Sequence, residues 1–145
     1  MKSFISLFFV LLFGCSNSDE TSIRESSPYA EGLTTHFITV NNITRKYLVY
    51  RPSGMTNINA VVTVLHGGGG LGVGVSELGA HPLSVFRTIA DQEKFLVIYP
   101  EGSLDSLGNP GWNDCRSDDI SGSQGDDITF LKQLRAANAD LLNKA

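Results

Sequence analysis

The residue types that most directly suggest chemistry in this sequence are a histidine and four consecutive glycines. His66 and Gly67–Gly70 follow the apolar run Ala60–Leu65, in the stretch VVTVLHGGGG. Glycine loses more backbone freedom on folding than any other residue, so four in succession indicate that the backbone must come close to something. Two ligand classes, a dinucleotide and an ester, are recognised by glycine-rich loops of this kind.

The dinucleotide interpretation uses the pattern G-x-G-x-x-G, which residues 67–72 match directly after an apolar run. That fingerprint needs a helix beginning at the glycines and an acidic residue about 20 positions further along. We expect no helix there, because glycines and a proline interrupt the chain up to Pro82, and Glu101 is the nearest suitable acid. The sequence therefore disfavours a dinucleotide site.

The ester interpretation uses His66-Gly67-Gly68-Gly69 as an H-G-G-G motif. Acyl transfer places negative charge on the former carbonyl oxygen, and backbone N–H groups without side chains in the way can stabilise it. In esterases and lipases of the α/β-hydrolase fold, this motif follows the third strand. We count the apolar run 60–65 as the third strand, so Gly67, Gly68 and Gly69 are candidate oxyanion-hole residues.

Hydrophobic patterns predict four strands and two helices around this loop. Asn41-Asn42 suits a two-residue hairpin turn, and the apolar runs suit strands buried on both faces. The expected strands are His36–Val40, Ile43–Tyr50, Ala60–Leu65 and Phe95–Tyr99; the expected helices begin at Pro82 and Asp126; and the expected loops are Gly67–His81 and Glu101–Gly125. This order predicts an α/β fold in which an antiparallel hairpin leads into a parallel sheet with flanking helices.

Apolar spacing predicts which helix faces are buried. The expected buried faces carry Leu83, Phe86, Ile89 and Ala90 in the first helix and Ile128, Leu131, Leu134 and Leu141 in the second. Asp126 is expected to cap the second helix, and Asp127 to favour its N-terminal dipole. His81 is expected where the first helix starts, and His36 is expected to face solvent from its strand.

The first residues have the pattern of an export signal. Lys2 precedes the apolar run Phe4–Phe13, which has the length of a signal-peptide core and is too short to span a bilayer. Leu12-Phe13-Gly14-Cys15 resembles the lipobox of bacterial lipoproteins, in which the cysteine is lipidated. We expect a signal peptide over 1–14, a polar tether over 15–32 and the domain over 33–145. The alternatives are plain secretion and a cytosolic chain.

Composition limits the function classes. The chain has 145 residues, 41% apolar and 18% charged, and a formal net charge of −4. This composition predicts one soluble domain and no nucleic-acid partner, because nucleic-acid binding requires a basic patch. Because Cys15 is expected to carry lipid, Cys115 has no expected partner in this chain, which leaves a free thiol, an intermolecular bridge or a partner in a missing segment.

Four segments in order, VVTVLHGGGG, FLVIYPEG, GWNDC and DDITFLKQL, resemble the poly(3-hydroxybutyrate) depolymerase and feruloyl-esterase-like family. The resemblance covers Thr35 to Leu142 and corresponds to the N-terminal half of these exported serine esterases of the α/β-hydrolase superfamily. It implies an oxyanion hole at Gly67–Gly69, with Gly68 foremost, and a structural His66 that supports the loop. It also implies an ester substrate, of the polyester or esterified-polysaccharide class with small carboxylesters left open, and no cofactor. Membrane attachment, expected only through lipid on Cys15, follows from the lipobox-like segment.

The family's catalytic triad is missing from this sequence. Its nucleophile lies in G-x-S-x-G between a strand and a helix, and the near matches around Ser123 and Ser76 each lack a glycine and follow polar or loop residues. The resemblance places the nucleophile strand after Ala145, and the triad Asp and His further on. We therefore expect a truncated α/β-hydrolase domain that is inactive by itself, and a Cys115 partner in the missing part is one possibility.

Other residues of the second long loop have two interpretations each. Trp112 and Asn113 are candidates for contacting substrate, and the alternative is a tryptophan packed beneath its own loop. The acidic residues near them are expected to cap and solvate rather than bind metal, since no calcium-loop spacing occurs; they are Asp114, Asp118, Asp119, Asp126 and Asp127. The competing function is a non-catalytic lipid-anchored binding module that keeps half of the esterase fold.

Overall fold

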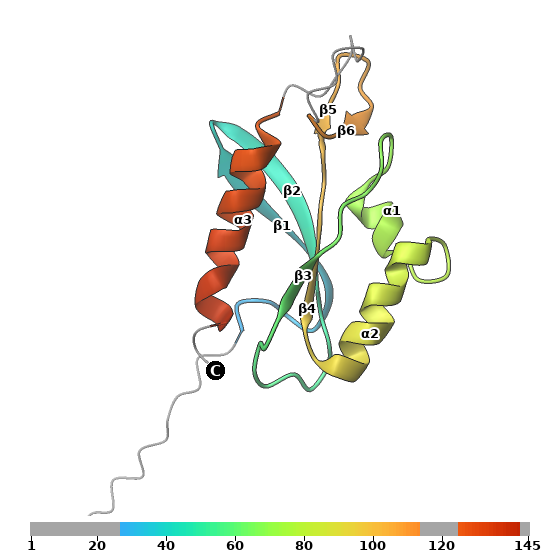
Figure 1. The fold of residues 1–145 in the computed structure, drawn as a ribbon, viewed down its shortest axis with the longest axis vertical. Helices are drawn as coiled ribbons and strands as arrows, with labels where there is room; N and C mark the ends of the chain where they lie inside the picture. Colours follow the sequence, from blue (N-terminus) through green and yellow to red (C-terminus); the bar gives the residue numbers. More distant parts are fainter. Residues whose placement is uncertain (1–26, 114–124, 143–145) are drawn as a thin grey trace, which may run out of the picture.

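The computed structural model describes residues 27–113 and 125–142 (Figure 1). Four strands form the main sheet, two short strands form a separate hairpin, and helices flank the main sheet. In chain order the elements are β1 (Gly32–Val40), β2 (Ile43–Arg51), β3 (Val61–Thr63), α1 (Gly72–Ser76), the 3₁₀ turn η1 (Pro82–Ser84), α2 (Val85–Glu93), β4 (Leu96–Pro100), β5 (Ser103–Leu104), β6 (Pro110–Gly111) and α3 (Asp127–Leu142).

The first hairpin forms where the sequence predicts it. Asn41 and Asn42 both have positive φ, 49° and 64°, as a type I′ turn requires, and Val40 pairs with Ile43. The paired strands begin four residues earlier than expected, at Gly32. Tyr29, within the segment expected as a tether, is also buried in the core, so ordered structure begins before Leu33.

The main sheet has the strand order β1-β2-β4-β3. β2 pairs with β4 in antiparallel register, and β3 pairs with β4 in parallel register, with Val61 opposite Leu96. The expectation of an α/β fold in which an antiparallel hairpin leads to a parallel pair is therefore confirmed. β3 is shorter than the expected strand over 60–65, although Val64 N–H still donates to Ile98 O at 2.9 Å.

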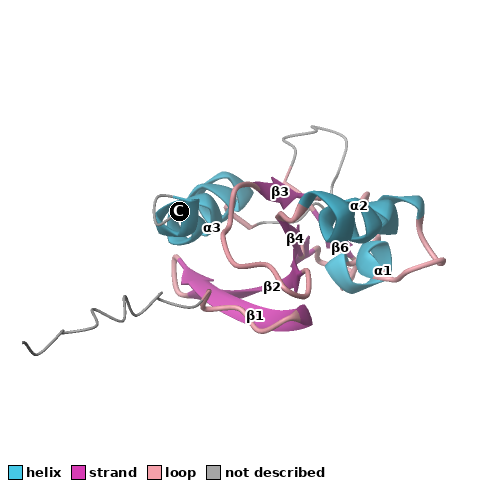
Figure 2. Cartoon of the chain, turned by 90° about the horizontal axis from the view of Figure 1, so that it is seen from below, coloured by secondary structure: helices cyan, strands magenta, loops and turns pink. Residues whose placement is uncertain are grey.

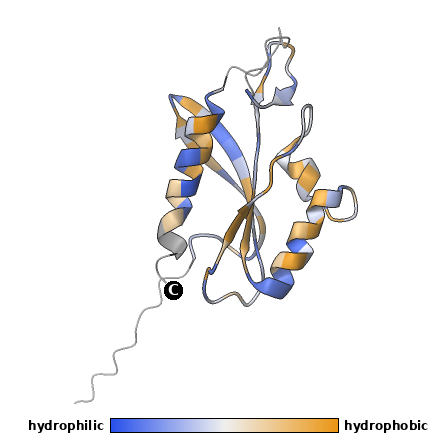
Figure 3. Cartoon of the chain, in the orientation of Figure 1, coloured by the Kyte–Doolittle hydropathy of each residue, from blue (hydrophilic) through white to orange (hydrophobic). Residues whose placement is uncertain are grey.

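Helices cover both faces of this sheet, with α3 on one face and α1 and α2 on the other (Figures 1 and 2). All five residues of β4 are buried, and they alternate between the two faces. Leu96 and Ile98 belong to the core under α3, whereas Val97 and Tyr99 belong to the core under α1 and α2. Figure 3 shows hydrophobic residues along β3 and β4, as expected for strands covered on both sides.

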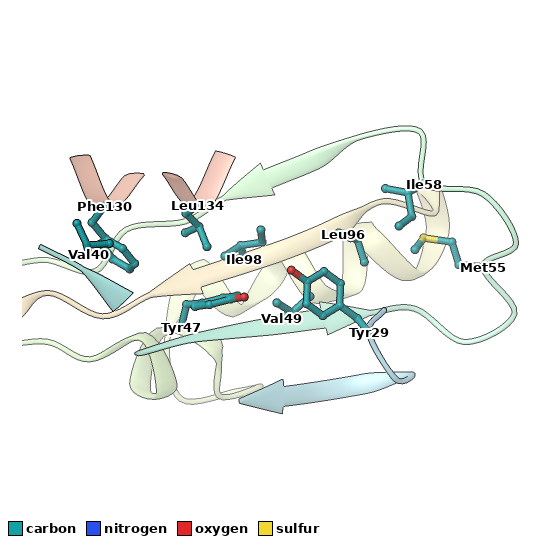
Figure 4. Packing of buried hydrophobic residues seen from close by; sticks show 10 residues of the cluster. All are labelled: Tyr29, Val40, Tyr47, Val49, Met55, Ile58, Leu96, Ile98, Phe130 and Leu134. Carbon is teal, nitrogen blue, oxygen red and sulfur yellow. The ribbon is translucent and has the colours of Figure 1, made fainter. Parts of the chain in front are cut away.

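The buried face of α3 differs from the expected one. Phe130 and Leu134 are 0% and 2% exposed and point into the core under α3 (Figure 4), with Leu131 partly buried beside them, whereas Ile128 is 64% exposed. The side chain of Leu141 lies outside the described part. The reason is the start of the helix, where a buried contact between Asp127 and β2 sets the rotation that turns Ile128 outward.

Two expected loops contain regular structure. The loop over 67–81 contains α1, although its sequence GVGVS has weak helix propensity. The loop over 101–125 contains the β5–β6 hairpin, in which Asp105 accepts backbone N–H bonds from Leu107 and Asn109 at 2.8 and 2.7 Å. α1 packs on β4, a contact between distant residues that a local pattern does not reveal, whereas the Asp105 bonds of the hairpin are local.

Two expectations at the helix starts are confirmed, and one about the buried face of α2 is not. His81 accepts a bond from Leu83 N–H at 3.1 Å, and Asp126 accepts one from Thr129 N–H at 2.9 Å. The latter bond lowers the pKa of the Asp126 carboxyl below its usual value. Ile89 in α2 is 36% exposed, so it lies at the edge of the buried face rather than within it.

His36 is half-buried rather than solvent-facing. Its ring lies 4.8 Å from that of Tyr29 and 5.5 Å from that of Tyr47, and burial lowers its pKa. Cys15, Cys115 and Ser123 lie outside the described residues. Among the helices of the described part, none is long and apolar enough to cross a membrane.

The core under α3 yields a paired test of the helix rotation. We expect Phe130→Ala to lower the free energy of unfolding by about 3–5 kcal/mol, because a fully buried aromatic ring is lost. Ile128→Ala should change it by less than about 0.5 kcal/mol, because the side chain is exposed. Urea unfolding of both variants measures the difference, and equal losses would contradict the described rotation of α3.

Candidate functional site

The glycine loop lies at the carboxyl end of the parallel strand pair. β3 ends at Thr63, and Val64–Gly70 leads from it into α1, while Glu101 and Gly102 follow β4 directly. Loops beyond the carboxyl ends of parallel strands are where α/β folds bind ligands. The fold therefore brings His66, the glycines and Trp112 together from two separate segments.

His66 joins the two segments through both ring nitrogens. It is 3% exposed, and its Nε2 accepts a bond from Gly102 N–H at 2.9 Å. Because a backbone N–H can only donate, Nε2 is unprotonated and the ring proton is on Nδ1, which donates to Gly67 O at 2.7 Å. The ring thus holds the glycine loop against the chain that follows β4.

Trp112 packs against the same loop. Its indole Nε1–H donates to His66 O at 2.8 Å, and its ring lies 4.9 Å from the His66 ring. This donor is already used within the protein. The geometry matches the alternative of a tryptophan packed beneath its loop more closely than that of a residue whose N–H meets a substrate.

Asn113 turns away from the loop and toward the start of α3. Its backbone N–H donates to Asp127 Oδ2 at 2.6 Å, and its side chain donates to Gly125 O at 3.4 Å. Asp127 Oδ1 in turn accepts from Arg45 Nη2 at 2.6 Å. Asn113 therefore belongs to the network that anchors the segment after β4 and not to the glycine loop.

Arg45 is the member of this network that the sequence analysis missed. It is 4% exposed, and besides Asp127 it donates to Glu101 O at 3.2 Å. Its guanidinium also lies 4.2 Å from the centre of the Phe130 ring. The feature of the sequence that could have revealed its burial is the two-residue period of β2, which places Arg45 on the same face as Tyr47 and Val49.

The glycines of the loop differ in what requires them. Gly69 has a φ of +73°, a conformation that side-chain-bearing residues rarely adopt, and its N–H donates to Pro110 O at 2.9 Å. Gly70 N–H donates back to Gly67 O at 3.0 Å. The N–H groups of Gly69 and Gly70 are therefore engaged within the fold, and neither is available to a ligand.

Gly67 and Gly68 have neither requirement. Neither has a positive φ, and a Cβ atom added to either would meet nothing within 4 Å. Their N–H groups make no hydrogen bond with any other described residue. Both line a pocket of about 400 Å³, whose other walls include Leu71, Val75, Glu77 and His81. Two backbone donors thus border an open pocket, and nothing in the described fold explains why they are glycines.

Gly72 explains part of the glycine pattern in structural terms. A Cβ atom there would lie 2.7 Å from Tyr99 O, so α1 can pack on β4 only through a glycine. The expectation that no helix begins near the glycines was wrong, since α1 starts at Gly72. The dinucleotide interpretation gains little from this, because α1 has only five residues and the Glu101 carboxylate binds Lys46 Nζ at 3.0 Å.

A larger cavity, of about 530 Å³, lies along β3 and α3 and is lined by Val61, Leu65, Leu131 and Arg135 among others. None of the sequence-predicted site residues lines it. Its walls are mostly apolar, whereas the smaller pocket has two backbone N–H donors without a partner in the part of the chain that the structure describes. We therefore take the pocket beside the glycines as the candidate site, because donors rather than volume determine the chemistry.

The candidate site contains no metal centre among the described residues. In residues 27–113 and 125–142 no three His, Cys, Asp or Glu side chains are grouped so that they could hold a metal ion. Asp126 and Asp127, two members of the acidic cluster, are engaged in helix capping and in the Arg45 ion pair. The other three acidic residues lie in 114–124, outside the described part.

The different requirements of neighbouring glycines can be measured directly. We expect Gly68→Ala to leave the free energy of unfolding unchanged or to raise it by up to about 1 kcal/mol, because its conformation and space accept a methyl group. Gly69→Ala should lower it by about 1–2 kcal/mol, because of the positive φ. Thermal unfolding of both variants tests this, and a clear loss in Gly68→Ala would show that the fold itself requires that glycine.

The hydrogen bond through which His66 holds the loop can be tested at a single backbone amide. In His66→Phe the ring shape is retained, but Gly102 N–H loses its acceptor, which should cost about 1–3 kcal/mol of stability. Hydrogen exchange at the Gly102 amide should accelerate, whereas the Val64 amide, bonded to Ile98 O, should remain protected as the internal control. Unchanged exchange at Gly102 would contradict the assigned bond.

Comparison with known proteins does not identify a family for this chain: no protein-family model matches it, and no curated protein does. The resemblance to ester hydrolases therefore rests on the sequence segments quoted above.

Proposed function

We propose that this chain supplies the oxyanion loop of an exported serine ester hydrolase of the α/β-hydrolase type. Its substrate class would be a polyester or an esterified polysaccharide, and its nucleophile would come from residues outside these 145. The observation that carries the proposal is the pair of N–H groups of Gly67 and Gly68, which have no hydrogen-bond partner within residues 27–113 and 125–142 and border a pocket in the loop after the third strand.

The chemistry needs these donors at one moment of the reaction. Attack on the ester carbonyl converts its oxygen to an oxyanion, and each preorganised N–H aimed at that oxygen is worth about 3 kcal/mol of barrier. Preorganisation requires a loop that does not move as charge develops. The His66 ring, the Trp112 indole and the bond from Gly69 to Pro110 supply that rigidity.

Two serines lie in partial nucleophile motifs, and neither supports a nucleophile within this chain. Ser76 is fully buried within α1, and its Oγ donates to Val73 O at 2.8 Å, so it is not presented to a substrate. Ser123 lies outside the described residues. No G-x-S-x-G occurs in the sequence, and we therefore assign the nucleophile to residues outside this sequence.

The proposed location follows from the sequence alone. The lipobox-like segment ending at Cys15 supports export and anchoring by lipid, and both remain proposals. One observation favours the competing function, a non-catalytic lipid-anchored binding module: the cavity of about 530 Å³ beside β3 contains none of the proposed oxyanion residues.

A serine-directed fluorophosphonate distinguishes the two functions. In extracts of the source cells, an antibody against residues 31–145 should recover a polypeptide that carries the fluorophosphonate label. The 145-residue chain expressed by itself should neither be labelled nor hydrolyse 4-nitrophenyl butyrate. Heat-denatured extract, in which the labelling of other serine hydrolases also disappears, is the control.

Two results would contradict the proposal in different ways. Recovery of an unlabelled polypeptide, from an extract in which other hydrolases are labelled, would favour the binding module. Labelling of the 145-residue chain itself would show that one of its own serines is the nucleophile.

A further inference from the structure

The pocket beside Gly67 and Gly68 has a third polar wall, formed by His81. His81 is half-buried and lies between the pocket and the start of the η1–α2 unit. The sequence suggests only a structural role at this helix start, and His81 does fulfil that role through one ring nitrogen. The other nitrogen has no assigned role.

The hydrogen bond to the helix start determines which nitrogen carries the proton. His81 Nδ1 accepts from Leu83 N–H at 3.1 Å, so in the neutral ring the proton must be on Nε2. Nε2 makes no hydrogen bond with any other described residue. His81 is thus a fixed-tautomer donor on the wall of a pocket that already has two backbone donors.

The wall that carries His81 is held in place from outside the pocket. Arg87 of α2 donates from Nη1 to Ser76 O at 2.9 Å, which ties α2 to the end of α1. The Arg87 guanidinium lies 4.6 Å from the centre of the Tyr50 ring, so this tie is itself anchored on β2. Pro82 restricts His81 to its extended conformation, with φ −137° and ψ 138°.

Glu77 limits the charge of the ligand that these donors accept. It lines the same pocket and is exposed, and no salt bridge to it is found among the described residues. Its negative charge repels a carboxylate but does not repel a neutral oxygen acceptor. Leu71, Val75 and Ala80 supply apolar surface for a short acyl chain.

We propose that His81 is a substrate-binding residue, whose Nε2–H donates to a neutral oxygen of an ester with a short acyl chain, and that Glu77 disfavours the carboxylate product. The inference rests on the proposed function, because it places the acyl part of the ester in the pocket that Gly67 and Gly68 border. It adds the discrimination between ester and acid, which would assist release of the product.

The test uses the full chain labelled with ¹⁵N and two probes, ethyl butyrate and butyrate. Ethyl butyrate should shift the amide signals of Gly67 and Gly68 and the ring Nε2 signal of His81, and butyrate should bind more weakly. His81→Phe should weaken ethyl butyrate binding about three- to tenfold, the factor that one neutral hydrogen bond supplies. Glu77→Gln should strengthen butyrate binding by a larger factor than ethyl butyrate binding, because only butyrate carries a charge; equal changes for both probes would overturn the role of Glu77.

A second variant serves as a control in which the hydrogen bond to Leu83 N–H at the start of η1 is retained. In His81→Asn the side-chain oxygen can still accept from Leu83 N–H, as good N-cap residues do, but the distant Nε2 donor is gone. It should fold like the unmodified chain and weaken ethyl butyrate binding as His81→Phe does. Unchanged ester binding in His81→Asn, or a ring proton on Nδ1, would overturn the proposal.

The same titration separates this proposal from the function on which it rests. Shifts at Gly67 and Gly68 with equal affinity in all His81 variants would overturn the role of His81 and leave the oxyanion loop standing. A shift at His81 alone would overturn the oxyanion loop and leave the role of His81 standing. No shift at any of the three would overturn both.

Discussion

The buried ion pair between Arg45 and Asp127 is the interaction on which the other parts of the structure depend. The side chains are 4% and 6% exposed, so both charges have lost most of their water. Such a pair is tolerated only where further hydrogen bonds compensate the lost solvation. Glu101 O and the Phe130 ring complete the surroundings of Arg45, and Asn113 N–H completes those of Asp127. One contact therefore connects β2, the segment after β4 and the first turn of α3.

The glycine loop is held in place by that connected segment rather than by its own sequence. Gly102 binds the ring of His66, Pro110 O binds Gly69 N–H, and Trp112 binds His66 O, so three points between β4 and α3 hold the loop after β3. A sequence rich in glycine would be mobile without them. The N–H groups of Gly67 and Gly68, which no other described residue binds, border the pocket.

Much of the fold could be predicted from local patterns, because those patterns report local physics. Asn41-Asn42 defines its turn through backbone conformation, and the apolar run through Tyr99 identifies a strand buried on both faces. The predictions that failed at α1 and at Ile128 share one cause, which is a contact between residues far apart in the sequence. Gly72 forms the start of α1 because it touches Tyr99 O, and Ile128 is exposed because Asp127 is bound to Arg45 from 82 residues away. No window of neighbouring residues contains that information.

The sequence by itself determined the α/β order of elements, the hairpin turn, and the position of a glycine loop after the third strand. It did so because hydrophobic period, turn chemistry and glycine content act within a few residues of one another. Only the tertiary structure decided which glycines are available to a ligand. Gly69 has its N–H committed to Pro110, whereas the N–H groups of Gly67 and Gly68 have no partner among the described residues. That difference arises from residues about 40 positions away along the chain, which meet the loop only because β3 and β4 lie side by side.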